Sequence, residues 1–170
     1  MKKVFSFFPL LLVFPFTLQA QPASSLKNQL LKDWNRSKLY TQDYLKTMPA
    51  TQFSFRPQDS IRTFAQQMIH LSQATVSLME AATGSTIPNV INRQNLENTP
   101  SALGKDSVTY FVNISYDYAL QALQNFDMTK NFQFVKRGKF NESRLAWMLK
   151  AFEHQAHHRG QAAIYIRAVG

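Results

Sequence analysis

The four histidines of this chain lie in two places, and their spacing is typical of a metal site. His70 stands alone, whereas His154, His157 and His158 lie close together near the carboxy terminus. Residues four apart on a helix project from nearly the same face, so His154 and His158 could direct two imidazoles at one ion. A third imidazole from His70 would leave coordination positions open for water or substrate. The sequence therefore predicts one divalent transition metal bound by His70, His154 and His158.

Two alternatives to this ligand set stay open at the level of sequence. His154 and His157 are three apart and are also neighbours on a helix, so His157 could replace His158 as the ligand. We expect His157 to lie on a neighbouring face instead, as a packing residue or a support for a ligand. The second alternative is a set of histidines that never meet a metal, because a histidine pair at this spacing is a weak motif by itself.

Polar residues near the histidines are candidates for orienting them. Gln161 lies three residues after His158 and could bond a ligand imidazole or a bound water. The alternative for Gln161 is an ordinary polar helix position. Gln67 is one of several glutamines that flank His70. Glu153 points about 100° away from its neighbour on a helix, so we do not expect it to act as a general base.

Four amphipathic segments must position these side chains. Apolar residues recur at three- and four-residue intervals, which predicts helices. The four predicted helices span residues 24–48, 61–82, 105–126 and 141–169. Asp59 and Ser60 are expected to cap the second helix, and Gly84 to end it. The intervening segments 84–104 and 127–140 are predicted as long connectors, and the first is expected to pack over the bundle or to form part of a site.

These elements predict an all-α chain, a four-helix bundle with long connectors. The chain has only five glycines in 170 residues, which disfavours a turn-rich β-sandwich and a phosphate-binding loop. Two connectors of a dozen or more residues indicate that the helices are not joined in a simple up-down-up-down order. We expect a single domain over residues 21–170.

The amino terminus has the layout of a secretory signal peptide. Lys2 and Lys3 precede an uncharged, mostly apolar run from Val4 to Leu18, and Ala20 is a small residue at a plausible cleavage point. The run is short for a membrane span, and it contains prolines. We therefore expect cleavage after residue 20, a periplasmic or secreted protein, and no stable membrane anchor in the mature chain.

The distribution of charged residues indicates which classes of partner to expect. The formal net charge is +9, but lysines and arginines are scattered over the predicted helices, and residues 136–139 form the one tight basic group. No aromatic-interleaved basic stripe is present, so we expect no nucleic-acid partner. The chain has no cysteine, hence no disulfide. A homodimer is compatible with the sequence, although no feature of it argues for one.

Several stretches together resemble the DinB-like (also DinB/YfiT-like) superfamily. They are Trp34, Met48-Pro49 followed by Phe53-Ser-Phe-Arg-Pro57, Ile69-His70-Leu71, and His154-Gln-Ala-His157-His158-Arg-Gly-Gln161. The resemblance covers essentially the whole mature chain. It implies a four-helix bundle of up-down-down-up topology that carries nickel, zinc or a similar ion on the positions that match His70, His154 and His158. Iron, copper and manganese are the further alternatives for the metal.

The resemblance also implies an activity class. Some members of that superfamily are thiol-dependent transferases or isomerases, and others are described as metal-dependent hydrolases. The expected export departs from the relatives that use cytoplasmic thiols. The sequence thus predicts a metal-dependent hydrolase or transferase acting on an unidentified small molecule, and the alternative is a non-catalytic metal- or small-ligand-binding module.

Overall fold

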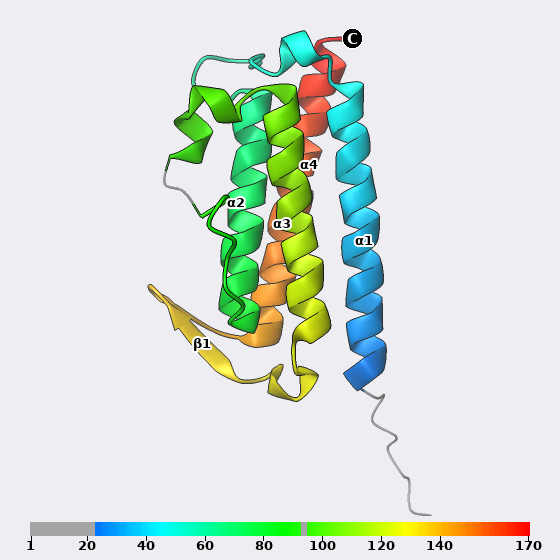
Figure 1. The fold of residues 1–170 in the computed structure, drawn as a ribbon, viewed down its shortest axis with the longest axis vertical. Coiled ribbons are helices and arrows are strands. Elements are labelled where there is room, and N and C mark those ends of the chain that lie inside the picture. The colour runs from blue at the N-terminus through cyan, green and yellow to red at the C-terminus, as the bar shows by residue number, and fades with distance from the viewer. Residues whose placement is uncertain (1–22, 93–94) are drawn as a thin grey trace, which may run out of the picture.

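The computed structural model describes residues 23–92 and 95–170, and its main feature is a bundle of α-helices (Figure 1). Four α-helices occur in these residues: α1 Ala23–Thr47, α2 Phe64–Thr83, α3 Lys105–Asn125 and α4 Arg144–Ala168. The predicted helical bundle is therefore confirmed. The expected signal peptide, residues 1–20, lies outside the described residues. Among the described residues, no helix combines the length and the apolar character needed to cross a membrane.

Helices α2 and α4 run antiparallel, and this pair positions the histidines. At one end of the pair, Arg144 Nη1 donates a hydrogen bond to the Ala82 carbonyl oxygen at 2.9 Å. Further along, Gln67 Nε2 lies 2.6 Å from His158 Nδ1. The first half of α2 therefore faces the second half of α4, and α1 and α3 complete the bundle beside them (Figure 1).

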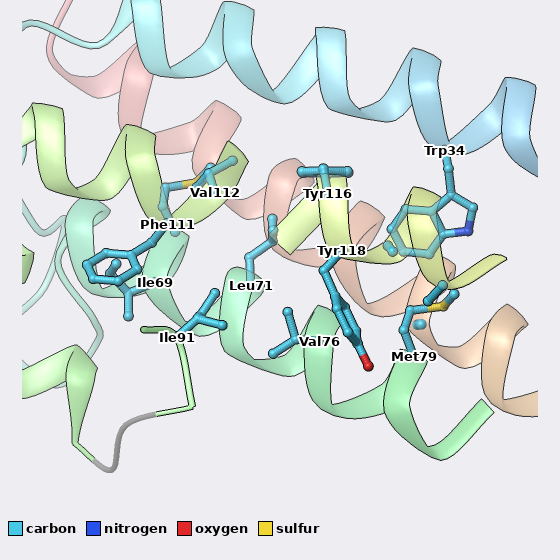
Figure 2. Packing of buried hydrophobic residues seen from close by; sticks show 14 of the residues in the cluster. Trp34, Ile69, Leu71, Val76, Met79, Ile91, Phe111, Val112, Tyr116 and Tyr118 are labelled. Carbon is cyan, nitrogen blue, oxygen red and sulfur yellow. The ribbon is translucent and has the colours of Figure 1, made fainter. Parts of the chain in front are cut away.

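The hydrophobic core lies between the four helices (Figure 2). Each helix contributes large side chains that are fully or almost fully buried, and Trp34 of α1 packs edge-on against Tyr116 of α3 with ring centroids 5.9 Å apart. Two apolar residues of the bundle, Leu39 of α1 and Leu149 of α4, lie outside this core and are 53% and 52% exposed. Burial of apolar surface at about 25 cal/mol per Å² holds this bundle together without disulfides.

The start of α2 differs from the prediction. The helix begins at Phe64, and Thr63 rather than Asp59 or Ser60 is its cap. Thr63 Oγ1 accepts from the Gln66 backbone N–H at 3.2 Å, and Gln66 Oε1 accepts from the Thr63 backbone N–H at 2.9 Å. This reciprocal pair is a capping box, which satisfies two amides that would otherwise lack partners.

The other end of α2 agrees with the prediction. Gly84 follows the helix with φ of +76°, a left-handed conformation that a residue without Cβ adopts without strain.

The connector before α4 contains a β-hairpin that the sequence analysis did not predict. Strands β1 Phe134–Arg137 and β2 Phe140–Ser143 pair antiparallel, and Gly138 at the turn has φ of +58°. The predicted start of the fourth helix at Asn141 is wrong, because residues 141–143 belong to β2. Ser143 caps α4 by accepting from the Ala146 backbone N–H at 3.2 Å.

The long connector from Gly84 to Gly104 packs on the bundle, as expected for a loop of this length. Its apolar side chains Ile91, Leu96 and Ala102 are buried, and two short 3-10 turns, at 96–98 and 100–102, give it local structure. The first of these turns contacts α2. This contact brings Glu97 to the face of α2 that carries His70.

Candidate metal centre

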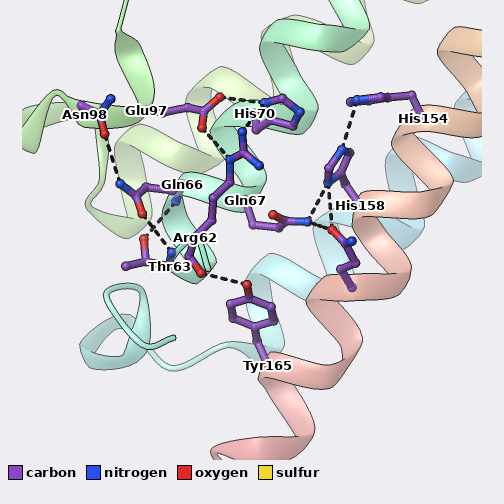
Figure 3. Close-up of polar contacts among 11 residues, drawn as sticks. Arg62, Thr63, Gln66, Gln67, His70, Glu97, Asn98, His154, His158 and Tyr165 are labelled. Atoms are coloured by element: carbon purple, nitrogen blue, oxygen red, sulfur yellow. Dashed lines mark hydrogen bonds and ion pairs between the residues drawn. The ribbon is translucent and has the colours of Figure 1, made fainter. Parts of the chain in front are cut away.

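Three histidines from two helices meet at one point between α2 and α4 (Figure 3). His70 comes from α2, and His154 and His158 come from consecutive turns of α4. One ring nitrogen of each lies within 4.8 Å of those of the other two. The ring centroids are 5.3 Å apart for His70 and His154, 4.6 Å for His70 and His158, and 4.3 Å for His154 and His158. These three residues could hold one metal ion.

The two histidines of α4 have a spacing that suits a shared ion. His154 Nε2 and His158 Nε2 lie 3.1 Å apart. Two nitrogens that each lie about 2.1 Å from one zinc ion in tetrahedral geometry are about 3.4 Å apart. The helix thus presents both nitrogens near the separation that one ion requires.

Glu97 and Arg62 orient the imidazole of His70. His70 Nδ1 lies 2.7 Å from Glu97 Oε1 and 3.2 Å from Arg62 Nη2. A guanidinium only donates and a carboxylate only accepts, so Nδ1 cannot bond both. The shorter contact to the carboxylate favours a proton on Nδ1 that His70 donates to Glu97. The lone pair of His70 is then on Nε2, the nitrogen left for a metal.

Glu97 is held in turn by Arg62, whose Nε donates to Glu97 Oε2 at 2.7 Å. Burial raises the pKa of this carboxyl, but hydrogen bonds and charge from Arg62 and His70 outweigh burial and lower the pKa below 4.5. Glu97 is therefore a carboxylate at neutral pH, which is the form that accepts a hydrogen bond from a ligand imidazole.

Two glutamines contact the imidazole of His158. Gln161 Oε1 lies 3.1 Å from His158 Nδ1, and Gln67 Nε2 lies 2.6 Å from the same atom. An imidazole that ligates through Nε2 carries its proton on Nδ1, and Gln161 Oε1 is an acceptor for that proton. The Gln67 amide nitrogen donates to the same Gln161 oxygen, so the two glutamines form a hydrogen-bonded pair beside the imidazole.

His157 lies outside this group of three. Its side chain is exposed, and its Nε2 lies 2.9 Å from Gln161 Nε2, which donates to it. His157 thus supports the centre only through Gln161 and through ring contact with His158, with centroids 4.9 Å apart.

Burial keeps the two α4 imidazoles neutral. Loss of solvent, followed by repulsion from neighbouring charged groups, lowers the pKa of both His154 and His158 from 6.5 to about 4. The neighbours include His70 in both cases. At neutral pH each ring therefore has a free lone pair, and the three-nitrogen donor set fits a borderline transition metal such as zinc or nickel.

Helix periodicity predicted how the histidines are placed but not which residues orient them. Glu97 is separated from His70 by most of the 84–104 connector, and no spacing rule links the two. One signal was available: Glu97 is the one acidic residue between Glu80 and Asp106, in a connector that was expected to pack over the bundle. Arg62 carried no such signal, because it lies in a part of the chain that was predicted to be helical.

Comparisons with known proteins agree on the family. The family model of the DinB family matches residues 21–170. The fold is similar to that of a DinB-like protein from Bacillus cereus, with TM-score 0.70, 17% identity and coverage of 83% of this chain and 91% of the other. It is also similar to that of a DinB-like protein from Bacillus subtilis, with TM-score 0.67, 13% identity and coverage of 84% and 92%. Among curated proteins, none matches. The chain belongs to the DinB family.

Proposed function

We propose that this protein binds one divalent transition metal through His70, His154 and His158 and uses it in hydrolysis or group transfer on a small molecule. One observation carries the proposal: three imidazole nitrogens from two helices lie within 4.8 Å of one another. When bound, such an ion acts as a Lewis acid and lowers the pKa of a water or thiol at an open coordination position. Zinc and nickel are the proposed metals, ahead of iron, copper and manganese.

The chain's own residues prepare the centre in two ways. Glu97 and Gln161 accept hydrogen bonds from Nδ1–H of His70 and His158, which leaves the Nε2 lone pair of each ring free for the ion. Burial keeps His154 neutral, so no proton must leave this ring before it ligates at pH 7.

A non-catalytic binding module is the second candidate, and one observation favours it. Glu97 is the carboxylate that contacts the histidines, and both of its oxygens are engaged, by His70 and by Arg62. It is thus not free to take a proton from an attacking water. A module of this kind would hold a small ligand at the open coordination positions without turnover.

Metal analysis and a substrate screen test the two candidates together. The purified chain is expected to contain about one metal ion per molecule, and a His154→Ala, His158→Ala variant to contain none. The loaded protein is then assayed with activated esters, amides and thiol acceptors. Turnover in the wild type that is lost in the His70→Ala variant supports the enzymatic function. Stoichiometric ligand binding without turnover supports the module, and equal, negligible metal in both proteins contradicts the metal centre.

We further propose that the protein is exported to the periplasm or beyond and that its helices follow the up-down-down-up order. The charged head, apolar run and Ala20 support export, and the course of the 84–104 connector along the bundle supports the helix order (Figure 1). The proposed partner is a small molecule rather than a nucleic acid, because the basic residues are dispersed. A homodimer is compatible with these features. Detection of the mature chain in the periplasmic fraction tests the first point.

A further inference from the structure

A cavity of about 390 Å³ opens beside the histidine centre on the side of the β-hairpin. His154 and His157 line the end nearest the centre, and Leu78, Phe140 and Trp147 supply apolar walls. Small-molecule sites usually have volumes of about 300–1,000 Å³. This cavity is therefore large enough for one organic group, and one of its walls is a candidate metal ligand.

The β-hairpin holds the walls of this cavity in place. Trp147 Nε1 donates to the Val135 carbonyl oxygen at 3.1 Å, which ties α4 to β1. Phe140 of β2 packs edge-on against Trp147, with centroids 6.4 Å apart. Arg137 pairs with Glu80 of α2 at 3.6 Å, so the hairpin is attached to both helices (Figure 1). Phe140 nevertheless remains 50% exposed, because its ring faces this open space.

Two positive and two negative side chains surround the cavity. Lys150 is paired with Glu142 at 3.3 Å, Glu153 also lines the cavity, and Lys139 Nζ lies 5.4 Å from the centroid of the Phe140 ring. His70 borders a second cavity of about 400 Å³ whose lining includes Gln73, Glu80 and other polar groups. The centre thus has an apolar side at His154 and a polar side at His70.

We propose that the cavity at Phe140 and Trp147 binds an uncharged apolar group of the substrate, of about the size of an aryl ring. The reacting group of the substrate then binds the ion at the histidines, and the polar remainder of the substrate lies toward His70. This assignment of substrate class rests on the proposed function, because it uses the ion as the point where the substrate reacts. It selects aryl-bearing esters, amides or thiols over compounds with small alkyl groups.

A matched pair of metal-chelating probes tests the assignment. Phenylacetohydroxamate and acetohydroxamate differ by one phenyl ring, and both are titrated by calorimetry into the zinc-loaded protein. The phenyl compound is expected to bind at least about tenfold more tightly. Phe140→Ala should reduce this advantage several-fold, whereas Phe132→Ala should keep it, because Phe132 is 76% exposed and does not line the cavity. Equal affinities in the wild type, or an advantage unchanged in Phe140→Ala, would overturn the assignment.

A second probe separates failure of the cavity from failure of the metal centre. Binding of 4-fluorobenzyl alcohol to the metal-free protein is followed by fluorine NMR. The apolar subsite is supported if the wild type shows saturable binding, if Phe140→Ala weakens that binding and if Phe132→Ala preserves it. This result would hold even if zinc did not bind and the proposed function were lost. Absence of saturable binding in the wild type overturns the subsite, whatever the metal content.

Discussion

Glu97 joins the long connector to the histidine centre through its two oxygens. One oxygen accepts from His70 Nδ1 and the other from Arg62 Nε, each at 2.7 Å. A carboxylate behind a ligand imidazole fixes the ring and raises its basicity. Glu97 is therefore a positioning residue that would act on a bound ion only through His70.

Replacement of Glu97 by Gln is expected to weaken zinc binding about 10- to 100-fold, because a neutral amide no longer accepts a charge-assisted hydrogen bond from His70. Competition against a chromophoric chelator measures the affinity. Glu80→Gln is the matched control, since Glu80 pairs with Arg137 and not with a histidine. Zinc affinities that are the same for Glu97→Gln and the wild type would remove Glu97 from the centre.

The lowered pKa values of His154 and His158 predict how the stability of the protein depends on pH. The pKa of both His154 and His158 is about 4 in the folded protein and 6.5 ordinarily. Between these values the unfolded chain takes up protons that the folded chain refuses, so stability falls as pH falls from 6.5 to 4 and is unaffected above 6.5.

Between pH 7 and pH 5 the free energy of unfolding of the metal-free protein is expected to fall by about 2 kcal/mol, after allowance for solvent screening of the half-buried rings. Urea unfolding at pH 7 and pH 5 measures it. A His154→Gln, His158→Gln variant should lose distinctly less stability over the same range. An equal loss in the two proteins would place the titrating groups elsewhere.

Sequence alone predicted which three histidines the structure brings together, because helical spacing is a local property. The i, i+4 relation of His154 and His158 needs only a helix, and His70 then follows from the packing of two amphipathic helices. Glu97 could not be found in this way. Its position depends on how the 84–104 connector folds back on α2, which is a tertiary property.

At the scale of single elements, the start of α2 shows why boundaries are harder to predict than helices. Asp59 and Ser60 have the right side chains for a cap, but so does Thr63, and Thr63 also has Gln66 three residues later. The reciprocal bonds of the capping box decide in favour of Thr63. The cap matters for the site because it fixes the first turn of the helix that carries His70.

Thr63→Ala is expected to lower the free energy of unfolding by about 1 kcal/mol, because the Gln66 amide loses its partner. Urea unfolding monitored by circular dichroism measures the change. Thr86→Ala, at an exposed connector position, is the control and should be nearly neutral. A loss in Thr63→Ala no larger than in this control would show that another group caps the helix.

The β-hairpin escaped prediction because each strand is only four residues long. Short strands are marginal on their own. This pair is held in position by the hydrogen bond from Trp147 Nε1 to the Val135 carbonyl and by the one from Arg137 to the Ser77 carbonyl of α2. Gly138 at the turn was the local signal, since a two-residue hairpin loop favours positive φ.

At the scale of the whole molecule, a second buried polar cluster joins three helices on the other side of α4. Tyr116 of α3 donates to Gln155 Oε1 of α4 at 2.8 Å and contacts Thr41 Oγ1 of α1 at 2.7 Å. Arg159 Nη1 also donates to Gln155 Oε1 at 2.8 Å. Helix α4 thus buries polar groups on two faces, which explains why its apolar stripe is less regular than a simple bundle requires.

Tyr116→Phe is expected to destabilise the protein by about 1–2 kcal/mol, since Gln155 and Thr41 lose a buried partner while the ring stays in place. Thermal and urea unfolding measure the change. Tyr110→Phe, at a side chain that is 53% exposed, should have little effect. Zinc affinity should be unaltered in both variants, because this cluster is separate from the histidine centre.

The proposed function requires that histidines from both α2 and α4 hold one ion. The most direct measurement is the zinc content of the dialysed wild type and of four variants, His70→Ala, His154→Ala, His158→Ala and His157→Ala, by elemental analysis. We expect about one zinc per chain in the wild type and in His157→Ala, and a loss of most of it in the other three. Retention of zinc by His70→Ala or His158→Ala, or its loss in His157→Ala, would contradict this ligand set.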